Sequence, residues 1–180
     1  MNYMNIFKDI EAKRFKSIYL FYGEEEYVKQ QALNQLVDAL IDPQFRDLNY
    51  QVMDGSEVGV DEIINACETL PFMSDRRLIV VKDSVFLTNR RNGSDNQNSV
   101  EGGKRLGEYI KDIPPTTYVI FYVRNGIGSK SGLYKSIKKI GSVVEFSRLE
   151  DIDVKRWVVR EIGIHSKTIT KPAIEQFVYL

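Results

Sequence analysis

The sequence predicts an α/β fold of three layers, in which a mainly parallel sheet of about five strands has helices on both faces. The start of a small all-helical domain is expected to follow. Short apolar stretches typical of buried strands alternate with segments whose apolar residues recur every three or four positions, as in helices. Such alternation implies right-handed crossovers and a parallel sheet covered on both sides.

Five stretches have the composition of strands. Ser17–Tyr22 is apolar and aromatic almost throughout, and Leu78–Val81 is a continuous, mostly β-branched run, as expected for strands covered on both faces. The expected strands are residues 17–22, 48–52, 78–81, 117–123 and 142–146. The helices expected between them are residues 24–41, 61–70, 106–110 and 133–140.

Turn and capping residues set some of these bounds. Asp42-Pro43 ends the first of these helices, and Asp61 is expected to cap the second, in which Leu70 is the last apolar position. Residues 88–103 have no apolar period and are rich in Asn, Ser and Gly. We therefore expect a mobile surface loop there.

The strand signals stop past Leu149. Val154–Ile162 has the pattern of one helix, and Thr170-Lys171-Pro172 opens another that is cut off at Leu180. We therefore divide the chain into an α/β domain, residues 1–147, and the beginning of a helical domain, residues 148–180. Only part of that second domain is expected to be present.

The composition excludes several classes of function. The chain has 180 residues, 43% of them hydrophobic, and equal numbers of basic and acidic residues, 25 each, so no overall charge points to nucleic acid or a membrane. Residues 1–15 lack the apolar core of a signal peptide, which predicts the cytoplasm. A single cysteine and a single histidine, His165, exclude an internal disulfide and most zinc sites. His165 is expected at the surface.

The turn after the first strand lies where nucleotide-binding folds hold phosphate. A working phosphate loop needs the pattern G-x-x-x-x-G-K-[ST], but Gly23 is followed by Glu24, Glu25 and Glu26. Acids in a first helical turn interact favourably with the helix dipole and stabilise the helix by about 0.3–1 kcal/mol each. The same negative charges would repel a triphosphate. The strand at 78–81 also runs into Lys82 instead of a magnesium-binding acid. We therefore expect a degenerate phosphate loop, with no cofactor, metal or catalytic residue.

Several segments of the chain are informative when taken together. They are residues 19–25 (YLFYGEE), Asp54-Gly55, residues 69–81 (TLPFMSDRRLIVV), Tyr134-Lys135, residues 141–146 (GSVVEF) and the helix around Trp157. In their order and spacing, from about residue 17 to the end of the chain, they resemble one protein family, the bacterial DNA polymerase III delta subunit.

The resemblance implies a non-catalytic clamp-loader subunit with an AAA+-like first domain, a helical lid and a C-terminal collar that is absent here. Such a subunit binds the ring-shaped sliding clamp, the beta subunit, and opens it for loading on primed DNA within the DNA polymerase III holoenzyme, a DNA-directed DNA polymerase. Partner subunits of the ATPase and delta-prime types control that contact. DNA is expected to be contacted only indirectly or weakly, and a membrane not at all.

In the family, apolar side chains at the tip of the helix before the third strand grip the clamp. Here that tip corresponds to Leu70, Pro71, Phe72 and Met73. Pro71 cannot extend the helix, so the residues after it leave the helix axis. From the residues alone, packing within the domain's own core is the simpler interpretation. The resemblance implies the opposite for Phe72, with either Leu70 or Pro71 as the second anchor.

The neighbouring cations have two interpretations. Arg76, Arg77 and Lys82 either flank the clamp-binding tip or are solvated charges.

Two other functions stay open from the sequence. One is a P-loop-like NTPase with an unconventional nucleotide site. The other is direct nucleic-acid binding through the cations around the polar loop, Arg90, Arg91, Lys104 and Arg105. That loop has no interleaved aromatic residues for base stacking, so we expect weak binding at most.

Overall fold

A computed structural model describes residues 3–88, 96–124, 126–128, 131–148 and 151–178. The chain divides into two compact units, Met1–Phe146 and Ser147–Leu180. The elements of the first unit are α1 (Tyr3–Glu11), β1 (Ile18–Tyr22), α2 (Glu26–Leu40), a 3₁₀ turn (Pro43–Phe45), α3 (Arg46–Asn49), β2 (Tyr50–Asp54), α4 (Val60–Glu68), β3 (Arg77–Lys82), α5 (Asn96–Tyr109), a second 3₁₀ turn (Ile110–Asp112), β4 (Thr117–Tyr122), α6 (Gly132–Ile140) and β5 (Ser142–Glu145). The second unit contains α7 (Asp151–Ile164) and α8 (Lys171–Val178).

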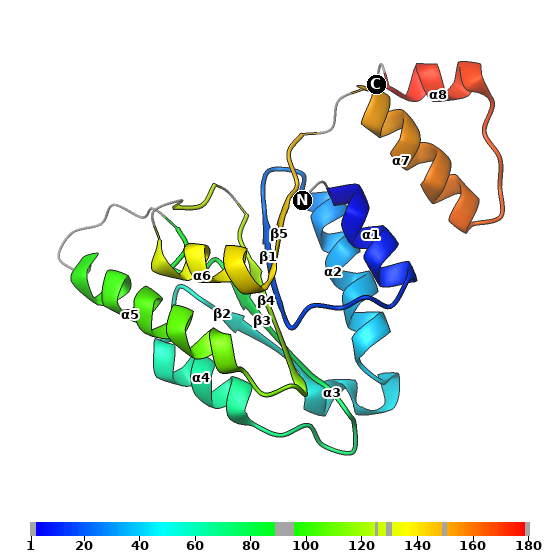
Figure 1. The fold of residues 1–180 in the computed structure, drawn as a ribbon. Coiled ribbons are helices and arrows are strands. Elements are labelled where there is room, and N and C mark those ends of the chain that lie inside the picture. The colour runs from blue at the N-terminus through cyan, green and yellow to red at the C-terminus, as the bar shows by residue number, and fades with distance from the viewer. Residues whose placement is uncertain (1–2, 89–95, 125, 129–130, 149–150, 179–180) are drawn as a thin grey trace. The chain divides into compact units, whose positions relative to one another are not determined.

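The first unit is built on one five-stranded sheet in the order β2-β3-β4-β1-β5, with every neighbouring pair parallel. Figure 1 shows α1 and α2 on one face and α4, α5 and α6 on the other. Alternate residues along a strand point to opposite faces. Leu20 therefore joins the core under α4–α6, while Phe21 packs on the other face, edge-on to Phe146 at 5.1 Å between ring centroids. The predicted α/β fold with helices on both faces is confirmed.

The elements differ from the sequence-based expectations at four places. Residues 3–11 form a helix that was not expected, and Asn96–Gly103, expected as loop, form the first part of α5. Residues 89–95, the rest of the predicted loop, lie outside the described residues. Leu48 belongs to α3 and not to a strand. The cap of α4 is Gly59, whose N–H donates to the Glu62 carboxylate at 2.7 Å, and not Asp61.

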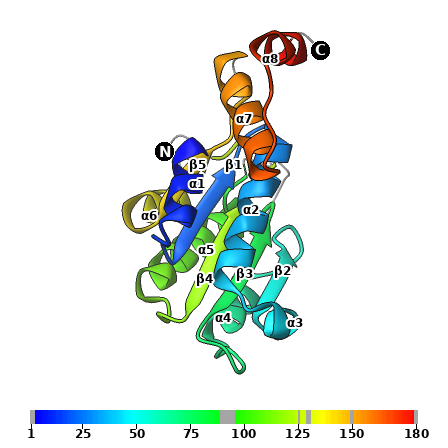
Figure 2. The ribbon, with the colours of Figure 1, turned by 90° about the vertical axis from the view of Figure 1, so that its right-hand side faces the viewer.

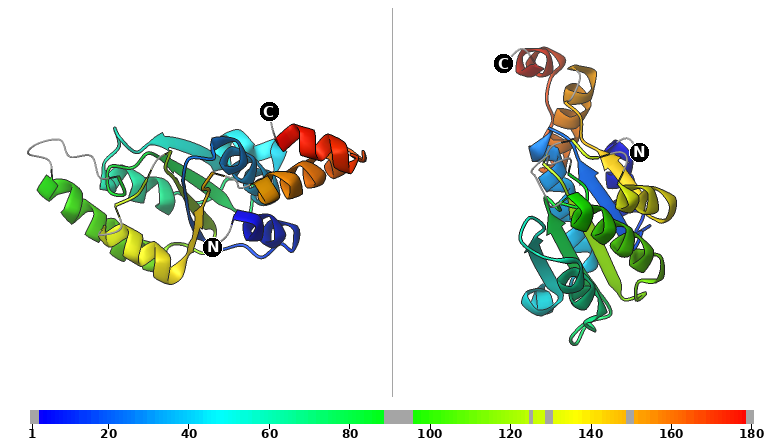
Figure 3. Two further views of the ribbon diagram at one scale, coloured as in Figure 1. Left: turned by 90° about the horizontal axis from the view of Figure 1, so that it is seen from above. Right: turned by 90° about the vertical axis from the view of Figure 1, so that its left-hand side faces the viewer.

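Packing between distant segments explains two of these differences, the helices at residues 3–11 and 96–103. The apolar side of α1 packs its Tyr3, Ile6, Phe7 and Ile10 into the core, so tertiary contacts stabilise a helix whose sequence signal is short. The helix α5 lies beside α6 (Figures 1 and 3), and Gly102, in the segment expected as loop, allows Phe86 to pack closely against α5 because a Cβ at this position would lie 2.7 Å from the Phe86 ring. Glycine-rich composition therefore marks helix packing here and not a loop.

In the second unit, α7 and α8 pack against each other. The single histidine, His165, is exposed, as expected. Over the described part of the chain, no helix is both long and apolar enough to cross a bilayer.

Candidate functional site: a blocked crevice and an apolar tip

The parallel sheet places two features at opposite edges. The carboxyl ends of β1, β3 and β4 meet at one edge, where Gly23, Asp83 and Val123 follow these strands. The loop between α4 and β3, residues 69–76, lies at the other edge, where the strands begin. Figure 2 shows this loop projecting from the lower end of the unit. The six residues of β3 separate the two features by about 20 Å at ~3.3 Å per residue.

The carboxyl edge has a topological switch point between β1 and β4. The helix after β1, α2, covers one face, and the helix after β4, α6, covers the other. Open α/β sheets bind ligands in the crevice that such a divergence creates. A cavity of about 330 Å³ lies at this edge, lined by Glu24, Glu26, Lys82, Tyr122 and Arg124.

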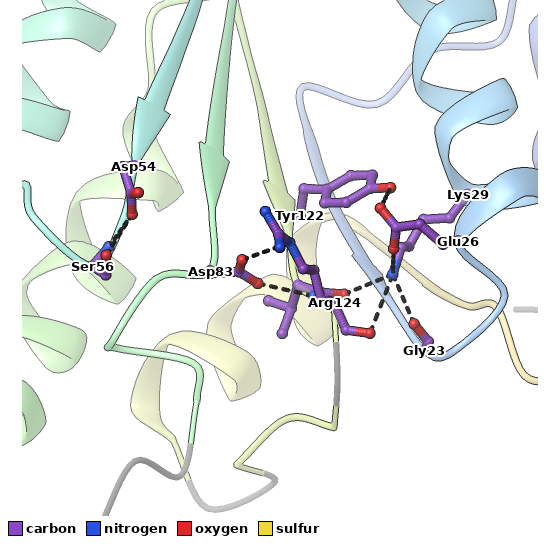
Figure 4. A network of polar contacts seen from close by, with 9 residues as sticks. Gly23, Glu26, Lys29, Asp54, Ser56, Asp83, Tyr122 and Arg124 are labelled. Carbon is purple, nitrogen blue, oxygen red and sulfur yellow. Dashed lines mark hydrogen bonds and ion pairs between the residues drawn. The ribbon is translucent and has the colours of Figure 1, made fainter. Parts of the chain in front are cut away.

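The crevice between β1 and β4 is occupied by a side chain that the sequence analysis missed. Lys29, at the end of the first turn of α2, is fully buried. Its ammonium donates to the carbonyl oxygens of Gly23 at 2.7 Å, Val123 at 3.1 Å and Arg124 at 3.4 Å (Figure 4). Lys29 therefore joins the end of β1 to the end of β4 from inside the protein.

Glu26 and Tyr122 complete the surroundings of the ammonium. The Glu26 carboxylate lies 2.9 Å from Lys29 Nζ and accepts a hydrogen bond from the Tyr122 hydroxyl at 2.6 Å. The ammonium also lies 4.9 Å from the centre of the Tyr122 ring. Burial alone would raise the pKa of Glu26, but the bonds from Tyr122 and Lys29 outweigh it and lower this pKa. Burial and the nearby carboxylate raise the pKa of Tyr122.

Lys29 stands in the register of the phosphate-loop lysine. It is six residues after Gly23, as the lysine is in G-x-x-x-x-G-K-[ST], although Val28 and Gln30 replace the glycine and the hydroxyl residue. The spacing was therefore a usable signal. The expectation that only acids occupy this place is wrong, because a lysine is present but bonds to the protein's own carbonyls.

The acids also differ from expectation. Helix α2 begins at Glu26, so Glu24 and Glu25 precede its first turn, and Glu25, at the N-cap position, makes no side-chain cap. Gly23 has φ +122°, and a Cβ there would lie 2.2 Å from the Phe146 carbonyl oxygen. That oxygen accepts from Glu25 N–H at 2.9 Å. Gly23 is thus required for a tight turn against the chain after β5.

The end of β3 is closed in a similar way. Asp83, with φ +49°, accepts from the backbone N–H of Arg124 at 3.0 Å and lies 3.2 Å from its guanidinium Nε. Figure 4 shows this pair beside the Lys29 network. A working nucleotide site would have a magnesium-binding carboxylate at the end of this strand, where Lys82 stands, and Asp83 is one residue later. Here it is paired with an arginine.

At the other edge, the tip residues are exposed. The exposed fractions are 75% for Leu70, 56% for Phe72 and 71% for Met73, and Pro71 is half-buried. Leu70 was expected to be the last apolar residue of helix α4. The helix ends at Glu68, so Leu70 lies in the loop that follows it. The simpler interpretation, that these side chains pack in their own core, is contradicted by their exposure. They form a contiguous apolar segment that we call the apolar tip, Leu70–Met73.

The three cations that the sequence left as either flanking the tip or solvated lie in different surroundings. Arg77 is buried, and its guanidinium donates to the carbonyl oxygens of Leu48 at 2.7 Å and Ala66 at 3.2 Å. Arg77 has almost no exposed surface, so both interpretations, a contact flanking the tip and a solvated charge, are wrong for this residue. Lys82 lies at the carboxyl edge, far from the tip. Arg76 is half-buried, with its guanidinium 5.5 Å from the centre of the Phe15 ring.

The cations considered for nucleic-acid binding divide similarly. Arg90 and Arg91 lie outside the described residues. Arg105 forms an exposed ion pair with Asp61 on α4, and Lys104 is exposed beside Gly132 at the start of α6.

Comparison with known proteins decides the family. The family model for the DNA polymerase III delta subunit matches residues 19–147. The chain belongs to the DNA polymerase III delta-subunit family. It is 28% identical to the DNA polymerase III subunit delta of Bacillus subtilis (strain 168) over 177 residues, which are 98% of this chain and 50% of that protein. This delta-family chain thus spans about half the length of the curated relative it matches.

Solved structures agree with the family. The DNA clamp loader delta protein of Bacillus subtilis has a TM-score of 0.82 and 26% identity, covering 98% of this chain and 51% of that one. A chain in the HORMA:CdnC:Trip13 complex of E. coli MS115-1 has a TM-score of 0.54 at 13% identity, over 94% of this chain and 60% of that one, and shares the fold. The first unit of this delta-family chain therefore has an AAA+-like fold.

Proposed function

We propose that this delta-family chain is the clamp-binding part of a non-catalytic clamp-loader subunit. It binds the sliding clamp through the apolar tip and helps to open the ring so that it can be loaded on primed DNA. The observation that carries the proposal is the exposure of Leu70, Phe72 and Met73 on one loop. Three large apolar side chains held in water by a single loop are typical of a protein-binding surface.

The energy available from the tip is sufficient for a specific contact. Burying each of these side chains in a partner groove contributes about 1.5–3 kcal/mol, reduced where the side chain is already partly covered. Association and side-chain ordering offset part of that gain. A few apolar anchors in a desolvated pocket commonly supply most of the affinity of an interface. We place Phe72 at the centre, with Leu70 and Met73 beside it.

The other proposed partners follow from the blocked crevice. A unit whose nucleotide position is filled by Lys29 depends on other subunits for ATP. We propose ATPase and delta-prime type subunits as these partners, with DNA contacted indirectly or weakly.

The test is the affinity of the chain for a purified sliding clamp, measured by surface plasmon resonance. Phe72→Ala should weaken binding by about 1.5–3 kcal/mol, or roughly 10- to 150-fold. Tyr27→Ala is the matched control, because Tyr27 is an aromatic residue of similar exposure, 61%, near the carboxyl edge. Equal affinity of the wild type and Phe72→Ala would remove the tip from the interface.

One observation favours the second function, an NTPase with an unconventional site: the phosphate-loop register of Lys29. The observed contacts oppose an NTPase function, because the Lys29 ammonium donates to carbonyl oxygens of the protein and Asp83 is paired with Arg124. Titration with fluorescent ATP and magnesium decides between the two. We expect no saturable binding up to millimolar nucleotide, and micromolar binding would favour the NTPase.

A further inference from the structure

The base of the apolar tip contains a buried amide. Asn49, the last residue of α3, is fully buried. Its Oδ1 accepts from the Phe72 N–H at 2.7 Å, and its Nδ2 donates to the Phe72 carbonyl oxygen at 2.8 Å. The same Nδ2 donates to the Phe45 carbonyl oxygen at 3.2 Å. One side chain therefore holds both peptide groups of Phe72, as a neighbouring β-strand would.

From these contacts we infer that Asn49 is a positioning residue, which fixes the direction in which Phe72 is presented to a partner. The inference rests on the proposed function, since it concerns how the same tip binds. Hydrogen bonds on both sides of one Cα leave its side chain a single exit direction. The Phe72 ring is 56% exposed while its backbone is anchored to a fully buried group. Asn49 itself has no surface with which to contact a partner.

The residues next to Phe72 restrict the loop further. Pro71 has its φ fixed by its ring, and Met73 has φ +47°, the left-handed region that non-glycine residues rarely adopt. A sparsely populated conformation persists only where surrounding contacts impose it. The amide of Asn49 supplies such contacts. Without these contacts, the free loop would sample several conformations. Binding would then have to select one of them, at a cost in conformational entropy.

Only an amide can make this pair of contacts. The Phe72 N–H needs an acceptor and the two carbonyl oxygens need donors, and Asn carries both kinds of group on one planar head. Asn49→Asp keeps the shape and the acceptor but puts an oxygen against two carbonyl oxygens. Asn49→Leu keeps the volume approximately and removes every hydrogen bond. Both variants are expected to release Phe72.

The first measurement is hydrogen exchange of the free chain, followed at the Phe72 amide by NMR. Exchange should be at least about tenfold faster in Asn49→Leu than in the wild type, because the Phe72 N–H has lost its acceptor. The second is affinity for a purified sliding clamp. Asn49→Leu should weaken binding about tenfold, but should weaken it no further in a chain that already carries Phe72→Ala.

Gln51→Leu is the control. The Gln51 side chain accepts from the Arg77 guanidinium at 2.9 Å, so this variant loosens the same base without releasing Phe72. We expect less than a twofold change in clamp affinity. If Asn49→Leu does not fold, Asn49→Ala, which also removes the acceptor of the Phe72 N–H and both donors, provides both readouts, with the same expected direction.

Three results would overturn the inference: unchanged exchange at Phe72, unchanged clamp affinity, or an equal loss of affinity with and without Phe72→Ala. The last result would mean that Asn49 acts on the domain generally. A wild-type chain that fails to bind the clamp would instead refute the proposed function. The exchange measurement would still decide whether Asn49 holds Phe72.

Discussion

Replacing Lys29 with methionine tests whether its ammonium stabilises the fold where a nucleotide would otherwise lie. Methionine keeps most of the length and apolar stem but removes the hydrogen-bond donors. The carbonyl oxygens of Gly23 and Val123 then lose a charged partner at 2.7 and 3.1 Å. Val123 is 1% exposed, so water does not readily replace that partner.

The magnitude follows from these contacts. A hydrogen bond to a charged group contributes about 1.5–3 kcal/mol, and a buried acceptor left unsatisfied costs about 1–3 kcal/mol. The ion pair with Glu26 adds little, because that side chain is 54% exposed and stays solvated. Removing the desolvation of the buried ammonium offsets part of the loss. We expect a net decrease of about 2–4 kcal/mol in the free energy of unfolding.

Urea unfolding followed by far-UV circular dichroism measures this difference. For a domain of this size the decrease corresponds to a fall in Tm of roughly 5–15 °C. Lys82→Met is the matched control, since Lys82 lies at the same edge but is half-exposed, and it should stay within about 0.5 kcal/mol of the wild type. Wild-type stability in Lys29→Met would refute the idea that this lysine holds β1 and β4 together.

Three further predictions concern the same unit. Glu26→Gln should reduce stability at neutral pH. Because the folded pKa of Glu26 is lowered, the difference from the wild type should shrink as pH falls from the ordinary value of 4.5 and vanish once pH is below the lowered folded pKa. A difference that persists in urea titrations at still lower pH would contradict this. Cys67 should resist alkylation at pH 8 in the native chain and react rapidly in urea, because burial raises the pKa of its thiol to about 12. Fast labelling of the native chain would show that α4 is not packed as described. Gly23→Ala should lower the free energy of unfolding by at least about 1–3 kcal/mol, because the backbone is strained there and the new Cβ would overlap the Phe146 carbonyl. The decrease should be seen as a lower urea midpoint, and an unchanged midpoint would mean that the turn can relax.

The sequence predicted the three central strands well because β1, β3 and β4 are covered on both faces and therefore appear as unbroken apolar runs. The elements it missed depend on contacts between distant segments. Helix α1 is stabilised by packing, and the glycines of α5 are explained by the residues from distant segments that pack against this helix. Local composition carries neither kind of information.

The site was predictable only in part. Phe72 was predicted to be exposed only from the resemblance to the delta-subunit family, because composition alone cannot distinguish an exposed phenylalanine from a core one. Lys29 had a sequence signal, its spacing from Gly23, but its inward direction depends on carbonyl oxygens that β4 brings close only after folding. Asn49 had no signal, since it lies 23 positions from the loop that it holds.

The position of β3 has a mechanical consequence. The loop that carries Phe72 joins the sheet at Arg77, the first residue of a strand that is paired along its length on both sides. A pull along that strand stretches the two hydrogen-bonded ladders in parallel, so the load is shared instead of opening one bond after another. A domain loaded in this way resists stretching along β3, so a force applied at the Phe72 loop is transmitted through the sheet to the carboxyl ends of the strands.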